Sequence, residues 1–169
     1  MTLCRWQLDG GNTMLEAILE KKTCAECRYC CVFDATDIWE MPLVDAAVRE
    51  AVLAALPGTS FNPDGDDWRF AVNAPADGRL VNCPALTAHG CMLGSDAPFE
   101  CRLWPMRVLV RDGRRVLALS PGCKALAALP ISTVAAHARA IAPKVAAYVA
   151  AHPQMIHPWR DDYRWLCDV

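Results

Sequence analysis

The chain has 169 residues, a formal net charge of −2 and a hydrophobic fraction of 54%. So small a charge gives no indication of a polyanion-binding protein, and we predict no nucleic-acid partner. The apolar runs are far shorter than the roughly 20 residues that cross a bilayer, which predicts no membrane association. Length and composition together indicate a single domain, 1–169.

The predicted elements begin with a helix over 14–22, capped by Asn12 or Thr13, in which acidic residues precede the lysines. A further helical stretch is expected to start at 36–37. Residues 45–56 carry apolar side chains at helical spacing and stop at a Pro-Gly pair, which predicts another helix.

The composition of 62–67 predicts a loop, and 68–72 alternates like a strand. An Asp-Gly turn precedes 80–83, so we expect 68–72 and 80–83 to form a hairpin. A second Asp-Gly turn separates 106–111 from 114–119, which is the clearest hairpin signal in the chain.

An Ala-rich helix is predicted over 133–151, with Ser132 as its cap and Pro143 kinking or dividing it. The aromatic and charged tail 157–165 is expected to fold back over the domain, so that 131–169 forms a C-terminal helix and tail. These elements predict a small α+β domain in which short hairpins and flanking helices surround a cysteine-rich centre.

Four cysteines stand close together in the run C-x-x-C-x-x-C-C, at Cys24, Cys27, Cys30 and Cys31. Two-residue gaps let successive thiolates turn inward on one loop, so that one metal ion or cluster collects several of them. Neighbouring side chains generally point apart, however, so we do not expect one ion to take both members of the adjacent pair. One of the two is expected to serve a second site, a supporting role or packing.

A second, looser group follows at Cys83, Cys91, Cys101 and Cys123. Residues 83–101 are rich in proline and glycine and have no long element, and so long a loop needs something to order it. Metal ligation by these cysteines supplies that order, so we predict a cysteine-cluster core over 24–126. Cys4 and Cys167 fall outside this group and are predicted to be lone thiols.

A disulfide framework is the plain alternative, because ten cysteines make an even number. Three features weigh against it. The N-terminal residues show no export signal, the chain is long enough to bury a core without staples, and the adjacent cysteines are awkward for separate disulfides. We therefore predict a reduced, cytoplasmic, metal-binding protein.

These cysteines and the residues around them resemble a known family, the CxxCxxCC cysteine-cluster proteins. The resemblance covers 24–126 and consists of the cysteine run followed by Cys83-Pro-Ala-Leu86, Gly90-Cys91, Pro98-x-x-Cys101-Arg102-Leu-Trp-Pro105 and Cys123. Members are described as zinc- or iron-chelating or iron–sulfur-containing domains, and most have no assigned activity. One departure is that Ala97 stands where an arginine commonly precedes the proline. If that arginine supports the cluster loop, its support is either missing here or comes from elsewhere, for example Arg102 or Arg107.

Two kinds of metal centre fit eight cysteines. One is a 4Fe–4S cluster held by four thiolates with the others around it, and the other is one or two zinc ions in closed four-thiolate sites. The second cysteine group lacks the paired C-x-x-C knuckles of zinc ribbons, whereas ferredoxin-type sites join a tight run of cysteines to a remote one. The spacing therefore favours iron–sulfur over zinc.

The function expected from this centre is electron transfer, redox sensing or structural support, with a redox or protein partner that the sequence does not identify. A zinc-stabilised binding module without redox chemistry is the alternative. No catalytic constellation is visible, so enzymatic activity stays open. His89 is expected to face solvent instead of ligating metal. The arginines of 102–115 are expected to be a solvated hairpin tip, with a patch for an anionic partner as the other interpretation.

Overall fold

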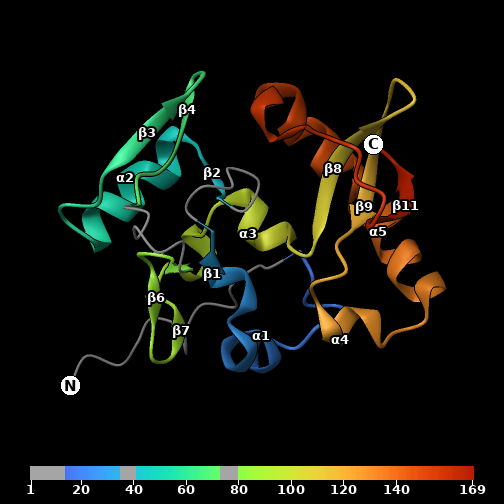
Figure 1. Cartoon of the computed structure of the whole chain (residues 1–169), viewed down its shortest axis with the longest axis horizontal. Helices are drawn as coiled ribbons and strands as arrows, with labels where there is room; N and C mark the ends of the chain where they lie inside the picture. The colour runs from blue at the N-terminus through green and yellow to red at the C-terminus, as the bar shows by residue number, and fades with distance from the viewer. Residues whose placement is uncertain (1–13, 35–40, 73–79) are drawn as a thin grey trace. The chain divides into compact units, whose positions relative to one another are not determined.

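The computed structural model describes residues 14–34, 41–72 and 80–169 (Figure 1). Helices and short sheets are both present, which confirms the predicted α+β class. The chain divides into two compact units, one containing Lys21–Arg102 and the other containing Met14–Glu20 and Leu103–Val169. The predicted cysteine-cluster core, 24–126, includes parts of both units, and the single-domain prediction stays a prediction. No helix in the described ranges is long and apolar enough to span a bilayer.

The first unit consists of short elements joined by tight turns. In chain order they are α1 (Lys21–Cys27), the 3-10 helix η2 (Tyr29–Cys31), β1 (Val32–Phe33), β2 (Leu43–Val44), α2 (Ala46–Ala55), β3 (Phe61–Asp64), β4 (Asp67–Phe70), β5 (Val81–Asn82), β6 (Leu86–Thr87), β7 (Gly90–Cys91), the 3-10 helix η3 (Gly94–Asp96) and α3 (Phe99–Leu103), whose last residue belongs to the second unit.

The helix predicted over 14–22 is wrong. Residues 14–18 form turns, in which the backbone N–H groups of Ile18 and Leu19 both donate to the Leu15 carbonyl at 2.9 and 2.8 Å, and α1 begins only at Lys21. Leu15 is buried, so tertiary packing outweighs the helical propensity of this segment. The proposed caps at 12–13 and the helical start at 36–37 lie outside the described residues.

The helix predicted over 45–56 is confirmed as α2. The carboxylate of Asp45 accepts a hydrogen bond of 2.9 Å from the Val48 N–H, which satisfies one of the free donors at the helix start. Val48 and Val52 are buried on the same face, and the Leu56 N–H closes the helix on the Val52 carbonyl. Local capping and apolar spacing were sufficient to predict this element.

The loop predicted over 62–67 is instead a hairpin, because β3 pairs antiparallel with β4. The turn lies between Asp64 and Asp67, and Gly65 adopts a positive φ of 64° there. Pro63 is tolerated because β3 is an edge strand in the order β2-β4-β3, where a missing N–H removes no internal ladder bond. The strand predicted over 68–72 corresponds to β4.

The hairpin predicted between 68–72 and 80–83 is also wrong. β5 pairs antiparallel with β1, with Val32 opposite Asn82, while β4 pairs with β2 and β3. The Asp-Gly turn that suggested the hairpin lies outside the described residues. A turn signal reports a local bend and does not select the partner of the strand that follows, so the β1–β5 pairing was not predictable from it.

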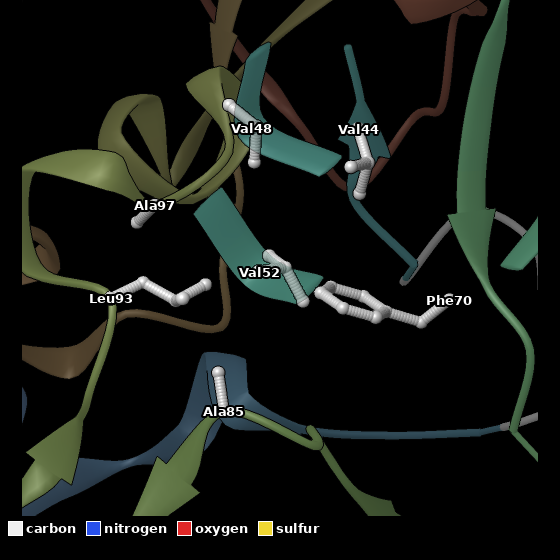
Figure 2. Packing of buried hydrophobic residues seen from close by; sticks show 7 residues of the cluster. All are labelled: Val44, Val48, Val52, Phe70, Ala85, Leu93 and Ala97. Carbon is white, nitrogen blue, oxygen red and sulfur yellow. The ribbon is translucent and has the colours of Figure 1, made fainter. Parts of the chain in front are cut away.

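One hydrophobic cluster forms the core of the first unit (Figure 2). It joins β2, α2 and β4 to the irregular segment after β5, through Val44, Val48, Val52, Phe70, Ala85, Leu93 and Ala97. Val52 and Phe70 point toward each other in Figure 2, with Leu93 and Ala85 beside them. Because Ala85 and Leu93 each lie two residues after a cysteine, this core anchors the cysteine-rich segment.

The second unit is built on a four-stranded sheet with the order β10-β8-β9-β11. Its elements are β8 (Met106–Arg111), β9 (Arg114–Leu119), α4 (Lys124–Ala127), α5 (Ile131–Ala151), the 3-10 helix η4 (Pro153–Met155), β10 (His157–Pro158) and β11 (Arg164–Asp168). The predicted hairpin of 106–111 with 114–119 is confirmed with Arg111 opposite Arg114. Asp112 and Gly113 both have positive φ, 52° and 75°, as a two-residue type I′ turn requires.

The predicted C-terminal helix and tail are confirmed in outline and differ in detail. α5 starts at Ile131 because Pro130 occupies its N-cap, so the predicted cap at Ser132 is wrong. α5 continues through Pro143 without being divided. The tail folds back as strands, since β10 pairs in parallel with β8 and β11 antiparallel with β9.

Candidate metal centre

The nine cysteines in the described ranges are thiols, none of them joined in a disulfide. Seven lie in the first unit, namely Cys24, Cys27, Cys30, Cys31, Cys83, Cys91 and Cys101. Cys123 precedes α4 and Cys167 lies in β11, so both belong to the second unit, where each is half-buried. Cys4 lies outside the described residues. Seven of the eight predicted ligands therefore share one compact unit.

The cysteine run is not a single inward-turning loop. Cys24 and Cys27 lie on α1, and Cys31 ends η2, with Arg28 between the two helices in a left-handed conformation at φ 54° and ψ 8°. Two backbone hydrogen bonds of 3.0 Å hold this bend, from the Arg28 N–H to the Cys24 carbonyl and from the Cys31 N–H to the Arg28 carbonyl. The bend changes the chain direction after α1. Cys24, Cys27 and Cys30 are exposed, and Cys31 is half-buried.

Arg28 also connects the run to the β6–β7 turn. Its Nε donates to the Ala25 carbonyl at 3.1 Å, and its Nη2 donates to the Ala88 carbonyl. Its positive charge lowers the pKa of Cys31. The sequence analysis gave Arg28 no role, because an arginine between two cysteines carries no signal of the carbonyls it contacts.

The expectation that Cys30 and Cys31 point apart is wrong. The Cys30 thiol and the Cys31 sulfur are hydrogen-bond partners at the end of η2. This bond raises the pKa of Cys30, as do burial and the charge of Cys31. It also lowers the pKa of Cys31 to about 7, against a burial effect that raises it. Cys31 is thus the more acidic member of the pair, with Cys30 as its donor.

Cys83 is joined to the cysteine run by backbone pairing. Its N–H donates a hydrogen bond of 2.7 Å to the Cys31 carbonyl, directly after the β1–β5 pair of Val32 with Asn82. The two cysteines therefore sit at the same end of a two-stranded ladder. Phe33 is buried at 2% exposure and anchors this ladder on its β1 side.

Cys91 is brought to Cys83 by the small β6–β7 hairpin. Leu86 is paired with Cys91, and the Leu86 N–H donates to the Cys83 carbonyl at 2.9 Å. The Met92 N–H donates to the Ala85 carbonyl, also at 2.9 Å. Cys83 and Cys91 both pack against the hydrophobic core of the unit. Two segments of the cysteine-rich loop are thus fixed side by side.

Backbone N–H groups point at two of these sulfurs. The Ala85 N–H donates to the Cys83 sulfur, and the N–H groups of Leu93 and Gly94 donate to the Cys91 sulfur. Burial is nevertheless the largest effect, and it raises the pKa of Cys83 to about 12 and raises that of Cys91. N–H···S bonds stabilise a thiolate, but here burial outweighs them, so the neutral thiol is the favoured form of both cysteines. The donors stay in place because Ala85 and Leu93 are anchored in the core.

Gly90 permits the β6–β7 turn to approach α1. Its φ is +104°, and a Cβ at this position would lie 3.4 Å from the Ala25 Cβ. Thr87 closes the turn, with its hydroxyl donating to the Gly90 carbonyl at 2.8 Å. The Gly-Cys pair in the sequence therefore has a conformational reason, since a side chain before Cys91 would strain the turn.

Cys101 is held through its neighbour Glu100 in α3. The Glu100 carboxylate accepts a hydrogen bond of 2.6 Å from the Leu43 N–H and lies 3.8 Å from the Nη1 of Arg69. Arg69 Nε in turn lies 2.7 Å from the Asp64 carboxylate, and the Arg69 and Glu100 side chains are only 5% and 6% exposed. This buried network fixes α3 to β2 and β4. Sequence reasoning missed Glu100, which looks like an ordinary charge in a short helix.

Cys101 is exposed as a residue, while its thiol is surrounded by protein atoms. Its residue is exposed by accessible surface, yet burial is the largest cause of its strongly raised pKa. The charges of Cys83, Cys91 and Cys31 raise this pKa further, followed by that of Glu100.

The sequence analysis named Arg102 and Arg107 as residues that could replace the arginine missing at position 97, and the structure places the two differently. Ala97 is buried in the hydrophobic core, so this position provides packing. Arg102 stacks 5.8 Å from the Phe99 ring, and its buried Nε has no hydrogen-bond partner among the described residues. Arg107 belongs to the second unit, where it stacks on Trp104 at 5.1 Å. Arg102 is thus the arginine beside Cys101 with hydrogen-bonding capacity to spare.

His89 and the arginines at the tip of the β8–β9 hairpin lie as expected for solvent-facing residues. His89 is exposed, as predicted. At the hairpin tip, Arg111 stacks on Trp159 and lies 3.9 Å from Asp112, and Arg114 stacks on Trp165 and lies 3.3 Å from Asp168. These exposed arginines already have carboxylate neighbours, which favours the solvated hairpin tip over an anion-binding patch.

In the part of the chain that the structure describes, no group of three or more His, Cys, Asp or Glu side chains is arranged to hold a metal ion. Comparisons with protein-family models, curated proteins and solved structures give no match for this chain.

Proposed function

We propose that this protein binds a 4Fe–4S cluster through cysteine thiolates of its first unit, and that it works in the reducing cytoplasm. The observation that carries the proposal is the convergence of thiols from separate segments on one small unit, with backbone N–H groups donating to the Cys83 and Cys91 sulfurs. The ligands come from the seven predicted cysteines of that unit, namely Cys24, Cys27, Cys30, Cys31, Cys83, Cys91 and Cys101. The resemblance to the CxxCxxCC cysteine-cluster proteins supports the same proposal.

The donor set fits such a group chemically. Iron–sulfur clusters are held by cysteine thiolates, and their properties depend on net charge, on hydrogen bonds to sulfur and on solvent exposure. This chain supplies thiols, N–H donors to sulfur and two nearby arginines, Arg28 and Arg102. When bound, a cluster would supply one-electron chemistry or a rigid cross-link. The role we propose is electron transfer, redox sensing or structural support of a partner protein.

Zinc is the alternative occupant, because four thiolates also make a closed tetrahedral zinc site. The test is to measure iron, acid-labile sulfide and zinc in protein purified without oxygen, together with its absorption spectrum. Iron and sulfide in equal amounts, with a broad band near ~400 nm that dithionite bleaches, are the expected result. Stoichiometric zinc without sulfide would replace the redox role by a structural binding module.

A further inference from the structure

Two exposed cysteines lie one turn apart on the helix α1. Cys24 and Cys27 both belong to this helix, as positions i and i+3. Side chains at this spacing lie on the same face of a helix, with their Cβ atoms about 5–6 Å apart. Both cysteines are exposed thiols. The fold therefore presents a pair of thiols to solvent, with the C-x-x-C spacing that is typical of redox-active dithiols.

Other residues of α1 hold the helix against its unit. Ala25 is half-buried, and a Cβ added at Gly90 of the β6–β7 turn would lie 3.4 Å from its Cβ. The Arg28 guanidinium joins the end of the helix to the same turn, because Nε donates to the Ala25 carbonyl at 3.1 Å and Nη2 donates to the Ala88 carbonyl. These contacts fix α1 and leave the two cysteines exposed to reagents in solvent.

A disulfide between the two sulfurs needs only a small adjustment of the helix end. Disulfides hold Cβ atoms about 3.5–4.5 Å apart, closer than the i and i+3 positions of a regular helix. Cys27 is the last residue of α1, and Arg28 after it already has a left-handed backbone with φ 54°. The last turn can therefore tighten without disturbing a further helical turn. A disulfide with imperfect geometry is more easily reduced, so this bond should be reversible.

The other cysteines are less suited to such a bond. Cys27 and Cys30 have the same spacing in the sequence, but the bend at Arg28 separates them, so they do not share a helix. Cys83 and Cys91 are half-buried and pack against the hydrophobic core. In the described ranges no other two cysteines belong to one α-helix.

We propose that Cys24 and Cys27 form a reversible redox pair that exchanges with a low-molecular-weight disulfide, such as oxidised glutathione. The thiolate of one cysteine attacks a sulfur of that disulfide, which forms a mixed disulfide and releases one thiol. The thiolate of the other cysteine then attacks the protein sulfur of the mixed disulfide, which closes the Cys24–Cys27 bond and releases the second thiol. Two protein thiols are oxidised, one disulfide is reduced, and the two protons end on the released thiols.

This inference goes beyond the proposed metal binding and does not depend on it. Two thiols suffice for a disulfide, whereas a closed zinc site or a 4Fe–4S cluster takes four. Disulfides in cytosolic proteins are usually transient and serve catalysis or redox sensing, and a reversible bond on an exposed helix has that character. Its formation would also remove both cysteines from the candidate ligands.

The test uses the full chain, treated with a chelator under reducing conditions so that no bound metal protects the thiols. The protein is equilibrated in glutathione buffers from reducing to oxidising, quenched with acid, blocked with N-ethylmaleimide and digested with trypsin. Cleavage after Lys22 and Arg28 leaves Cys24 and Cys27 together in the peptide 23–28. In oxidising buffer we expect this peptide to lack two hydrogens, in at least about ten times the amount of any other disulfide-linked peptide.

Excess reduced glutathione should restore both thiols of the peptide. A peptide 23–28 that carries glutathione or N-ethylmaleimide on both cysteines in every buffer would overturn the proposal. A disulfide that joins Cys27 to Cys30 instead would overturn it as well.

Single variants distinguish the pair from the general reactivity of exposed thiols. Cys24→Ser removes the thiol that resolves the mixed disulfide, so Cys27 should carry at least about ten times more bound glutathione than in the wild-type protein. Cys167→Ser is the matched control, because it changes a half-buried cysteine of the second unit, and oxidation of the peptide 23–28 should stay at the wild-type level. Circular dichroism verifies that each variant is folded. No added glutathione on Cys27 in folded Cys24→Ser would refute the exchange.

Discussion

The backbone N–H of Cys83 donates a hydrogen bond of 2.7 Å to the carbonyl oxygen of Cys31. All of α2 and the β2-β4-β3 sheet lie between these residues in the sequence, so the bond forms only when the first unit is folded. If both cysteines serve the proposed metal centre, metal ligation depends on tertiary structure, in contrast to a self-contained cysteine loop. We expect metal binding and the stability of the first unit to be coupled, because a bound metal stabilises only the state that assembles its ligands.

Replacement of Gly90 by alanine should impair metal binding by straining the β6–β7 turn. The residue has φ +104°, and the added Cβ would meet Ala25 of α1 at 3.4 Å. The left-handed backbone alone costs about 1–2 kcal/mol for a residue with a side chain. We expect Gly90→Ala to lower both the free energy of unfolding and the metal bound per chain.

The matched control is Gly58→Ala, because Gly58 has a similar φ of +93° but nothing within 4 Å of an added Cβ. Denaturant unfolding should show a comparable backbone penalty for the two variants, while metal analysis should show a loss for Gly90→Ala alone. Equal metal loss in both variants would mean that general destabilisation, and not the approach of the turn to α1, is responsible.

The sequence predicted those elements that depend on interactions between residues close together in the chain. The Asp112-Gly113 turn and the Asp45 cap each act within four residues, and both predictions are confirmed. Residue type alone also singled out the cysteines as candidate site residues, and their chemical role stays a prediction. The β1–β5 pairing escaped prediction because strand partners are chosen by the whole fold, and the turn signal at 77–78 favoured a neighbour in sequence.

The residues that hold the cysteine segments in place were less predictable than the cysteines themselves. The link from Arg28 to the Ala88 carbonyl and that from Glu100 to the Leu43 N–H join segments far apart in the chain. Neither residue differs in type from a solvated surface charge. The contact between the Cys30 and Cys31 thiols was mispredicted because the rule that adjacent side chains point apart is a general tendency, which this pair does not follow.

Replacement of Glu100 tests whether the buried network positions Cys101. Glu100→Ala leaves Arg69 without one of its carboxylates and the Leu43 N–H without this acceptor, and breaking a buried ion pair costs about 3–5 kcal/mol. Glu100→Gln keeps an oxygen to accept from Leu43, so it should retain more metal than Glu100→Ala. Metal content and the absorption spectrum of both variants give the readout.

Asp45→Ala is the control for Glu100, since loss of this cap destabilises α2 by about 0.5–2 kcal/mol in the same unit without touching a residue next to a cysteine. The positioning role predicts an altered spectrum for the Glu100 variants and an unaltered one for Asp45→Ala. An unchanged spectrum in folded Glu100→Ala would show that Glu100 stabilises the unit without positioning Cys101.

Arg28 is expected to affect the reduction potential of the proposed centre through its charge, in addition to holding the β6–β7 turn against α1. The Cys30 hydrogen bond is the largest effect that lowers the pKa of Cys31, and the positive charge of the Arg28 guanidinium lowers it further. A nearby positive charge favours the reduced, more negative form of a cluster, so Arg28→Gln should lower the reduction potential by on the order of tens of millivolts. Arg28→Lys keeps the charge while losing the forked contacts with Ala25 and Ala88, and its potential should stay close to wild type. Equal potentials for Arg28→Gln and the wild-type protein would exclude the electrostatic role.

In the metal-free protein, Cys31 and Cys83 should differ in the pH at which they react. Both are half-buried, so access is similar, but the Cys30 hydrogen bond lowers the pKa of Cys31 to about 7 while burial raises that of Cys83 to about 12. A lowered pKa means that the Cys31 thiolate predominates above roughly neutral pH, and a raised pKa means that Cys83 stays protonated through the same range. Only the thiolate is alkylated, so labelling of Cys31 should level off above pH about 8, whereas labelling of Cys83 should still rise roughly tenfold per pH unit.

The variant that isolates the cause is Cys30→Ala, which removes the thiol that donates to Cys31. Without that bond, burial should raise the pKa of Cys31, and its labelling profile should move to higher pH. The profile of Cys83 should stay in place, because burial is the largest cause of its shift. Site-resolved mass spectrometry of labelling rates across the pH range measures both profiles in one experiment. An unmoved Cys31 profile in Cys30→Ala would show that Arg28, the other group that lowers its pKa, is sufficient by itself.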